Sequence, residues 1–364
     1  MTKGLLRDPE LKGWSPSFEW LFSKPRLRGV RETFPGNLDP SSIGMICSAY
    51  QEWVRFHEYL LLKGKSSSGE WSPPVAVLCS KRGNDEHARR LDRRLGFLDS
   101  GKLKGIRFFS ANDFKIGRKV KTRLLWVDFS NDSKLGSIRD SWENDGYLFN
   151  KSLERLKKHF NGMDYLAFPQ PFDDPAGAAY GYVHRHAILY FPNHEFDVVQ
   201  RMVERDGRLQ MIYEVKDERQ DREIAIASGW HSFVDVQALS SMKGAVNYCR
   251  KYAQGALTSE TEKGTLTNAM GWFFKKHSYS MSHHFRAALA DLITQTFANL
   301  SRVEGQLTLQ GDPVDVWVWH FYGVWGWGEL GGSLEGPPPR ILSVSEDVFQ
   351  RCRAQYRKGT NCLD

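Results

Sequence analysis

The ten residues Tyr182-Val-His-Arg-His-Ala-Ile-Leu-Tyr-Phe191 constrain the fold of this chain more than any other stretch. Aromatic, β-branched and other apolar residues dominate it, and Gly181 and Pro192 flank it, which is typical of a β-strand. Side chains alternate across a strand, so we expect His184 and His186 to project from one face, a few Å apart. Two neutral imidazoles placed in this way make half of a divalent-metal site.

A third metal ligand is expected from the neighbouring strand, because only a hairpin partner lies within coordination distance. Residues 165–170 precede the histidine strand and read as a short strand, and the amide oxygen of Gln170 could complete the set. Pro169 and Pro171 indicate an edge strand or a bulge there. Two imidazoles and one oxygen donor leave open positions, which suits Mg²⁺ or Mn²⁺ acting as a Lewis acid on a phosphate.

A helical pattern follows about sixty residues later, over residues 241–252. Tyr248, Lys251 and Tyr252 share one of its faces, because they are three and four residues apart. A phenol is a poor nucleophile at neutral pH until a cation or a base assists it, and Lys251 offers that cation. The alternative is that both tyrosines belong to the core and the lysine to the surface.

The pattern from residue 116 onward predicts an α+β fold. The expected order is strand, helix, two strands, helix, two strands and helix, which matches a ferredoxin-like, RRM-like antiparallel sheet with added elements and with the histidines on a central strand. The expected elements are a strand over 120–129, a helix over 135–160 that is broken near Gly146 or continuous, strands over 165–170 and 182–191, a helix over 195–204, strands over 209–215 and 232–239, and the tyrosine helix.

Three segments follow from this reading: an N-terminal accessory region over 1–115, a catalytic domain over 116–295 and a C-terminal extension over 296–364. Helices are expected over 46–60 and over the basic stretch 85–95, which either contacts DNA phosphates or is a solvated face. The aromatic block 316–327, with Trp317 and Trp319 on one face, is a core element or a base-stacking platform. A basic helix is expected from Ser345 to near Lys358.

Composition favours a nucleic-acid partner. The formal net charge of +7 attracts phosphate backbones, and aromatic residues make up 13% of the chain, which provides rings for stacking on unpaired bases. The sequence contains no run of eighteen apolar residues, so it predicts no membrane span. Its five cysteines are scattered, which fits a reducing cytoplasm. The sequence carries no G-x-x-x-x-G-K-[ST] motif, so DNA unwinding would need another protein.

Together, the H-x-H strand, the oxygen ligand one strand earlier and the later Y-x-x-K helix resemble the HUH endonuclease superfamily. Within it, the likeness is to rolling-circle replication initiator (Rep) proteins of archaeal plasmids and viruses. It covers residues 116–290 and includes the stretches 124–130, 164–170 and 230–239. The chain departs from the family at three places: Arg185 is the middle residue of the histidine triplet, Gln170 stands where many relatives have glutamate, and Asp128 and Ser130 replace threonines of the first motif.

The resemblance implies a metal-dependent enzyme that nicks single-stranded or extruded origin DNA. Tyr248 would attack the phosphate to form a 5′-phosphotyrosine link, and the freed 3′-hydroxyl would prime a host polymerase. Tyr252 would serve a second strand transfer, or the mechanism uses one tyrosine. The implied partners are single-stranded DNA, origin duplex DNA, a polymerase and a helicase. Two alternatives remain open: an HUH single-strand DNA transposase, and a non-catalytic nucleic-acid-binding protein with the same sheet.

Overall fold

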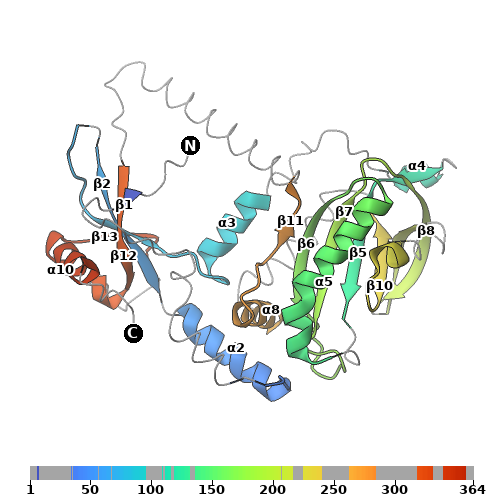
Figure 1. The fold of residues 1–364 in the computed structure, drawn as a ribbon, viewed down its shortest axis with the longest axis horizontal. Helices are drawn as coiled ribbons and strands as arrows, with labels where there is room; N and C mark the ends of the chain where they lie inside the picture. The colour runs from blue at the N-terminus through green and yellow to red at the C-terminus, as the bar shows by residue number, and fades with distance from the viewer. Residues whose placement is uncertain are drawn as a thin grey trace. The chain divides into compact units, whose positions relative to one another are not determined.

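The computed structural model describes residues 6–7, 34, 36–55, 57–66, 68–95, 109, 111–115, 119–131, 136–205, 207–215, 224–239, 262–283, 318–330 and 339–357. Contacts divide the chain into two compact units (Figure 1). The first unit comprises 1–33, 52–81 and 293–364, and the second comprises 34–51 and 82–292. Both units combine helices with sheets that are almost wholly antiparallel, so the expected α+β class is confirmed.

The second unit is built on a five-stranded antiparallel sheet with the order β10-β5-β7-β6-β11. Its strands are β5 (Leu124–Ser130), β6 (Asp164–Pro171), β7 (Val183–Tyr190), β10 (Val234–Ala238) and β11 (Ser280–Met281). Strand β7 carries the two histidines and lies in the middle of the sheet. The prediction of a strand over 182–191 is therefore confirmed.

The turn before β7 explains where this strand begins. Gly181 adopts a φ of +82°, a conformation that favours glycine. A Cβ atom at this position would lie 2.4 Å from Cδ1 of Ile43, so the packing also excludes a side chain. The indole Nε1 of Trp142 donates to the carbonyl oxygen of Gly181 at 2.8 Å. The turn is thus held by local backbone conformation and by contacts from distant segments.

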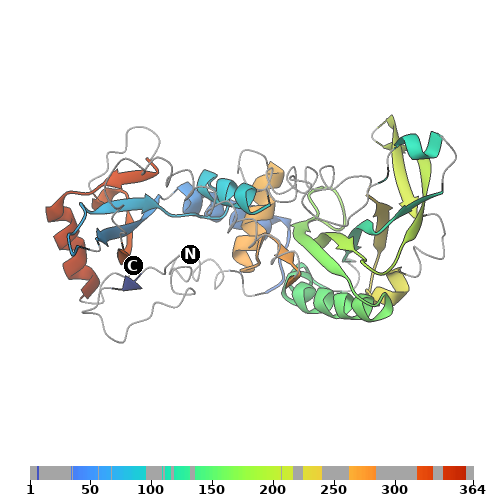
Figure 2. The same cartoon turned by 90° about the horizontal axis from the view of Figure 1, so that it is seen from above.

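One long helix, α5 (Ile138–His159), lies along one face of this sheet, as the green helix in Figure 2 shows. It begins with a capping box, in which the side chains of Ser137 and Asp140 bond to each other's backbone N–H groups. The helix is continuous through Gly146, so of the two expectations for this segment the continuous helix is correct. Gly162, at a φ of +114°, follows its end, where glycine commonly terminates a helix.

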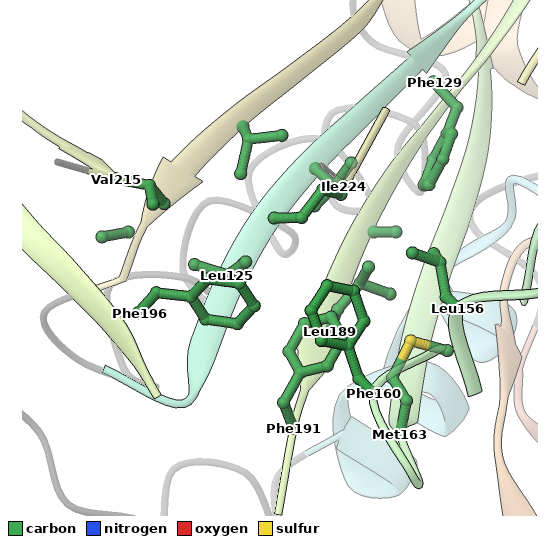
Figure 3. Packing of buried hydrophobic residues seen from close by; sticks show 14 of the residues in the cluster. Leu125, Phe129, Leu156, Phe160, Met163, Leu189, Phe191, Phe196, Val215 and Ile224 are labelled. Carbon is green, nitrogen blue, oxygen red and sulfur yellow. The ribbon is translucent and has the colours of Figure 1, made fainter. Parts of the chain in front are cut away.

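The main core fills the space between α5 and the sheet (Figure 3). Alternate residues of β5 and β7 face this core, because strand side chains alternate between the two faces. The buried residues from these strands and from α5 are Leu125, Val127, Phe129, Ala187, Leu189, Phe149, Leu153 and Leu156. His184 and His186 belong to the other face of the sheet.

The helix predicted over 195–204 is wrong. This segment is a strand, β8 (Phe196–Arg205), which pairs with β4 (Val120–Thr122) and β9 (Arg208–Val215) in a separate three-stranded sheet. Phe196 and Val198 alternate into the core, which is the pattern of a strand and not of a helix. The second helix of the predicted order is therefore replaced by the β8–β9 hairpin. The predicted strand over 120–129 is divided into β4 and β5 by Arg123.

Part of the region that the sequence assigned to an N-terminal accessory segment belongs to the second unit. The hydroxyl of Tyr50 donates to the carbonyl oxygen of Arg82 at 2.9 Å, and Nε of Arg82 donates to Oδ1 of Asn268 at 3.1 Å. These residues lie on or beside α2 (Pro40–Arg55), α3 (Asp85–Leu95) and α8 (Glu262–Phe273). The helix predicted over 85–95 is confirmed. The one predicted over 46–60 is present as α2, which runs from Pro40 to Arg55, but residues 58–60 belong to a strand, β2 (Glu58–Lys65).

The first unit has a five-stranded sheet in the order β1-β12-β2-β3-β13. Its strands are β1 (Leu6–Arg7), β2 (Glu58–Lys65), β3 (Val75–Leu78), β12 (Val318–Gly326) and β13 (Ile341–Ser343). The predicted C-terminal helix is present as α10 (Glu346–Arg357), and its Phe349 contacts Tyr322 at 4.8 Å between ring centroids. Strands from the first and last sequence segments thus share one sheet, which the division at residues 115 and 295 does not anticipate.

The aromatic block forms most of β12. Trp325 is buried in the core of the first unit, as the core interpretation expects, while Trp319 stays partly exposed. Trp317 lies outside the described residues. Two short elements complete the description, α4 (Ala111–Lys115) and the 3-10 helix η4 (Gly328–Leu330). Within the described ranges, no helix combines the length and the apolar character needed to cross a bilayer.

Candidate metal and DNA site

The two histidines of β7 lie side by side with their ring nitrogens facing each other. Nε2 of His184 is 3.0 Å from Nε2 of His186, and the rings are nearly perpendicular, at 87°. Two nitrogen ligands that are each about 2.1 Å from one ion and at right angles to it are about 3.0 Å apart. The pair therefore has the spacing of two neighbouring ligands on a single cation.

Asp128 on β5 lies directly opposite His186 in the sheet. Its Oδ1 is in hydrogen-bonding contact with Nδ1 of His186, which leaves Nε2 of that ring directed at His184. Histidines that bind metals generally use their second ring nitrogen in this way, and the carboxylate fixes the orientation of the ring. Sequence analysis placed Asp128 in the first motif but missed this contact, because the register between β5 and β7 is not a local property of either strand.

Aromatic rings pack against both imidazoles. The Trp126 ring lies 5.2 Å from that of His186, and the Phe172 ring lies 4.3 Å from that of His184, both at tilted angles. Such apolar neighbours limit the rotation of the imidazoles and exclude water from their flanks. The histidine geometry is therefore set by Asp128 and by these two rings together.

Gln170 on β6 lies directly opposite His184 and is 4% exposed. Strand β11 pairs only with Leu166 and Ala167 of β6, so in the described part of the chain β6 has no partner strand on that side at Pro169 and Pro171. Prolines are tolerated at such an edge because they have no N–H to donate. The edge position that the prolines predicted is thus present, and it leaves Gln170 in register with the histidines.

Arg185 projects to the opposite face, as the alternation predicts, and its partner is Asp145 of α5. Nε of Arg185 donates to both carboxylate oxygens of Asp145 at 2.8 Å, and its guanidinium lies 4.6 Å above the Phe149 ring. Asp145 is fully buried. The pair links α5 to β7 at the residue between the two histidines. Burial holds the pKa of the neighbouring Lys276 below its usual value, and the Asp145 carboxylate offsets only part of this effect.

The histidine face is partly a second buried surface and partly open. The buried residues on this face are Leu124, Trp126, Leu166, Phe168 and Ile188. Asp128, Ser130, His184 and Asp235 keep partial exposure on the same face. The histidine pair thus lies where the covered part of the sheet meets its accessible part, which is where a substrate could reach it.

A third metal ligand beside the two histidines would have to be Gln170. Among the described residues, no three His, Cys, Asp or Glu side chains come together as a metal site. Tyr248, Lys251 and Tyr252, and the whole predicted helix over 241–252, lie outside the described residues. The structure therefore brings together His184, His186, Gln170 and Asp128, and it does not bear on the predicted nucleophile.

No known protein family, curated protein or solved structure matches this chain. Its function is therefore inferred from the geometry of the site and from the sequence.

Proposed function

We propose that this chain is a metal-dependent endonuclease of single-stranded DNA, of the HUH type that starts rolling-circle replication. The observation that carries the proposal is the 3.0 Å approach of Nε2 of His184 to Nε2 of His186, with Asp128 behind the second ring. Metal-binding histidines usually bond a carboxylate through the ring nitrogen that does not face the metal, and Asp128 provides that partner for His186. The arrangement fits a cation that both rings share.

His184, His186 and the amide oxygen of Gln170 would hold Mg²⁺ or Mn²⁺. When bound, the cation supplies Lewis acidity to a phosphate oxygen. A glutamine contributes no charge, so this donor set carries none, and the nearest carboxylate in contact with it is Asp128. Because these three ligands are neutral, they leave the positive charge of the cation uncompensated. The site therefore favours an anionic substrate such as a phosphate.

The nucleophile in this proposal is Tyr248. Its phenolic oxygen attacks phosphorus, a new O–P bond joins the protein to the 5′ side of the break, and the bond to the 3′ oxygen breaks. The proton that the phenol releases balances the one that the departing 3′ oxygen takes up, and this oxygen becomes the hydroxyl that a host polymerase extends. Lys251 stabilises the developing negative charge, and Tyr252 serves the closing strand transfer. The net charge of +7 supports binding of DNA, and a helicase would supply unwinding in the cytoplasm of the host.

The test is a covalent-adduct assay with single-stranded oligonucleotides labelled at the 3′ end, because a 5′-phosphotyrosine link retains the 3′ fragment. We expect a labelled protein band that survives denaturation in the presence of Mn²⁺ and disappears with a chelator. His184→Ala and Tyr248→Phe should abolish it, whereas Tyr252→Phe should spare it. Origin-derived strands and transposon-end hairpins, tested side by side, separate a Rep from a transposase. DNA binding without any adduct would instead favour the non-catalytic alternative.

A further inference from the structure

An exposed aromatic residue lies in the same cross-strand row as the histidine site. Val234 of β10 pairs with Phe129 of β5, and the backbone N–H of Ser130 donates to the carbonyl oxygen of Phe233 at 3.0 Å. Phe233 therefore extends the register by one residue before the start of β10. Since Val234 contacts the core under α5, the alternation of side chains puts Phe233 on the histidine face.

The register gives the distance between this ring and the site. Phe233, Ser130, His184 and Gln170 form one row across β10, β5, β7 and β6. Phe233 and His184 are two strands apart, which corresponds to about 10 Å between their backbones. The Phe233 side chain is 66% exposed. Single exposed apolar residues are common on protein surfaces, so exposure alone does not indicate a binding role. Phe233 is a candidate because it also lies in one row with His184.

The charges near Phe233 favour a base over a phosphate as its neighbour. Asp128 and Asp235 are direct cross-strand partners on the histidine face, between Phe233 and the buried part of the sheet. Away from the cation proposed at the histidines, which offsets nearby negative charge, two carboxylates repel a sugar–phosphate backbone at short range. The bound DNA strand is therefore expected to turn its bases, and not its phosphates, toward this part of the sheet. A phenyl ring stacks on any base because it needs no hydrogen-bond partner.

We propose that Phe233 stacks on an unpaired nucleobase of the DNA strand whose phosphate lies at His184 and His186. The inference rests on the proposed function and extends it by naming the residue that positions the strand next to the cleaved bond. Its contribution is to affinity and placement and does not depend on base identity, since every base presents a π face.

The experiment measures the affinity of the full chain for two probes by fluorescence anisotropy: an oligo(dT) strand and a strand of the same length in which every nucleotide is abasic. Phe233→Ala should weaken oligo(dT) binding by about 5- to 150-fold, the range expected for one base–aromatic stack. It should leave the abasic strand and Mn²⁺ binding unchanged. Phe233→Trp should keep the preference for oligo(dT), which also shows that the position tolerates substitution.

Tyr147→Ala is the matched control. Tyr147 is 61% exposed and lies on α5, the layer on the other side of the sheet, so its loss removes an exposed ring without touching the histidine face. Oligo(dT) affinity should not change in this variant. If Phe233→Ala binds oligo(dT) as tightly as wild type, or loses both probes equally, the stacking inference is overturned. Adduct formation is measured separately, so a wild-type chain that binds but never forms adducts contradicts the proposed function and not the stack.

Discussion

Asp128 contacts Nδ1 of His186 from the neighbouring strand, and this contact determines which nitrogen of that imidazole faces His184. The two residues are direct partners in the β5–β7 register. A contact of this kind between a carboxylate and an imidazole orients the ring and raises its basicity as a ligand. Asp128 is therefore a positioning residue whose effect on a metal passes through His186.

Replacing Asp128 by alanine should weaken Mn²⁺ binding by about 10- to 100-fold, the usual effect of losing such a partner. Asp128→Asn should weaken it less, because the amide oxygen still accepts a hydrogen bond from Nδ1. Isothermal titration with Mn²⁺ measures both. Asp235→Ala is the control, since it removes a nearby carboxylate that bonds to Gln237 and not to a histidine. Equal losses in the Asp128 and Asp235 variants would mean that only general electrostatics is at work.

The buried pair of Arg185 and Asp145 gives a prediction about stability. Asp145→Leu leaves a guanidinium without its carboxylate in a buried place, which should cost about 3–5 kcal/mol in the free energy of unfolding. The double variant Asp145→Leu/Arg185→Met should recover most of this loss, because it leaves no uncompensated charge. Urea unfolding of the three proteins checks the prediction. A double variant that is no more stable than the single one would contradict it.

The sequence was sufficient for elements whose signals are local. Gly181 and Pro192 bounded the histidine strand, and the apolar spacing in α5 identified a long helix. The segment 195–204 was misread because its apolar residues fit a helical and an alternating pattern at once, and pairing with β9 decided between them. Asp128 and Asp145 were not identified as partners, since their contacts join residues 58 and 40 positions apart. The β2–β12 pairing is more distant still, and no local pattern predicts it.

Two glycines provide opposite predictions. Gly181→Ala should destabilise the chain by more than 1 kcal/mol, because the residue has a positive φ and an added Cβ would meet Ile43 at 2.4 Å. Gly146→Ala should stabilise it by about 0.5–1 kcal/mol, because Gly146 lies inside α5 and an added Cβ meets nothing within 4 Å. Thermal and urea unfolding measure both variants. A stabilised Gly181→Ala protein would refute the packing described at this turn.

The cap of α5 predicts a specific dependence on pH. Hydrogen bonds from the side chain and backbone of Ser137 lower the pKa of the Asp140 carboxyl below its usual value. A carboxylate of this kind stabilises the folded state above its unfolded pKa of about 3.9, and the effect is lost as the pH falls through the lower folded value. The stability gap between wild type and Asp140→Asn should therefore be full above about pH 5 and should close in stronger acid.

Ser137→Ala provides the control for this prediction, because it removes the hydroxyl that donates to Asp140, the larger cause of the lowered pKa, and keeps the backbone N–H. In that background, Asp140→Asn should produce a smaller gap in unfolding free energy at neutral pH. Urea unfolding at a series of pH values measures all four proteins. A gap that stays constant into strong acid would show that the cap does not act through the ionised carboxylate.

The most direct measurement is anomalous scattering from crystals of the chain soaked in Mn²⁺. The account predicts one Mn²⁺ peak about 2.0–2.5 Å from Nε2 of His184, Nε2 of His186 and the amide oxygen of Gln170, with Asp128 still in contact with Nδ1 of His186. A crystal in which Mn²⁺ binds elsewhere, while Nε2 of His184 and Nε2 of His186 share a hydrogen bond and no ion, would contradict it.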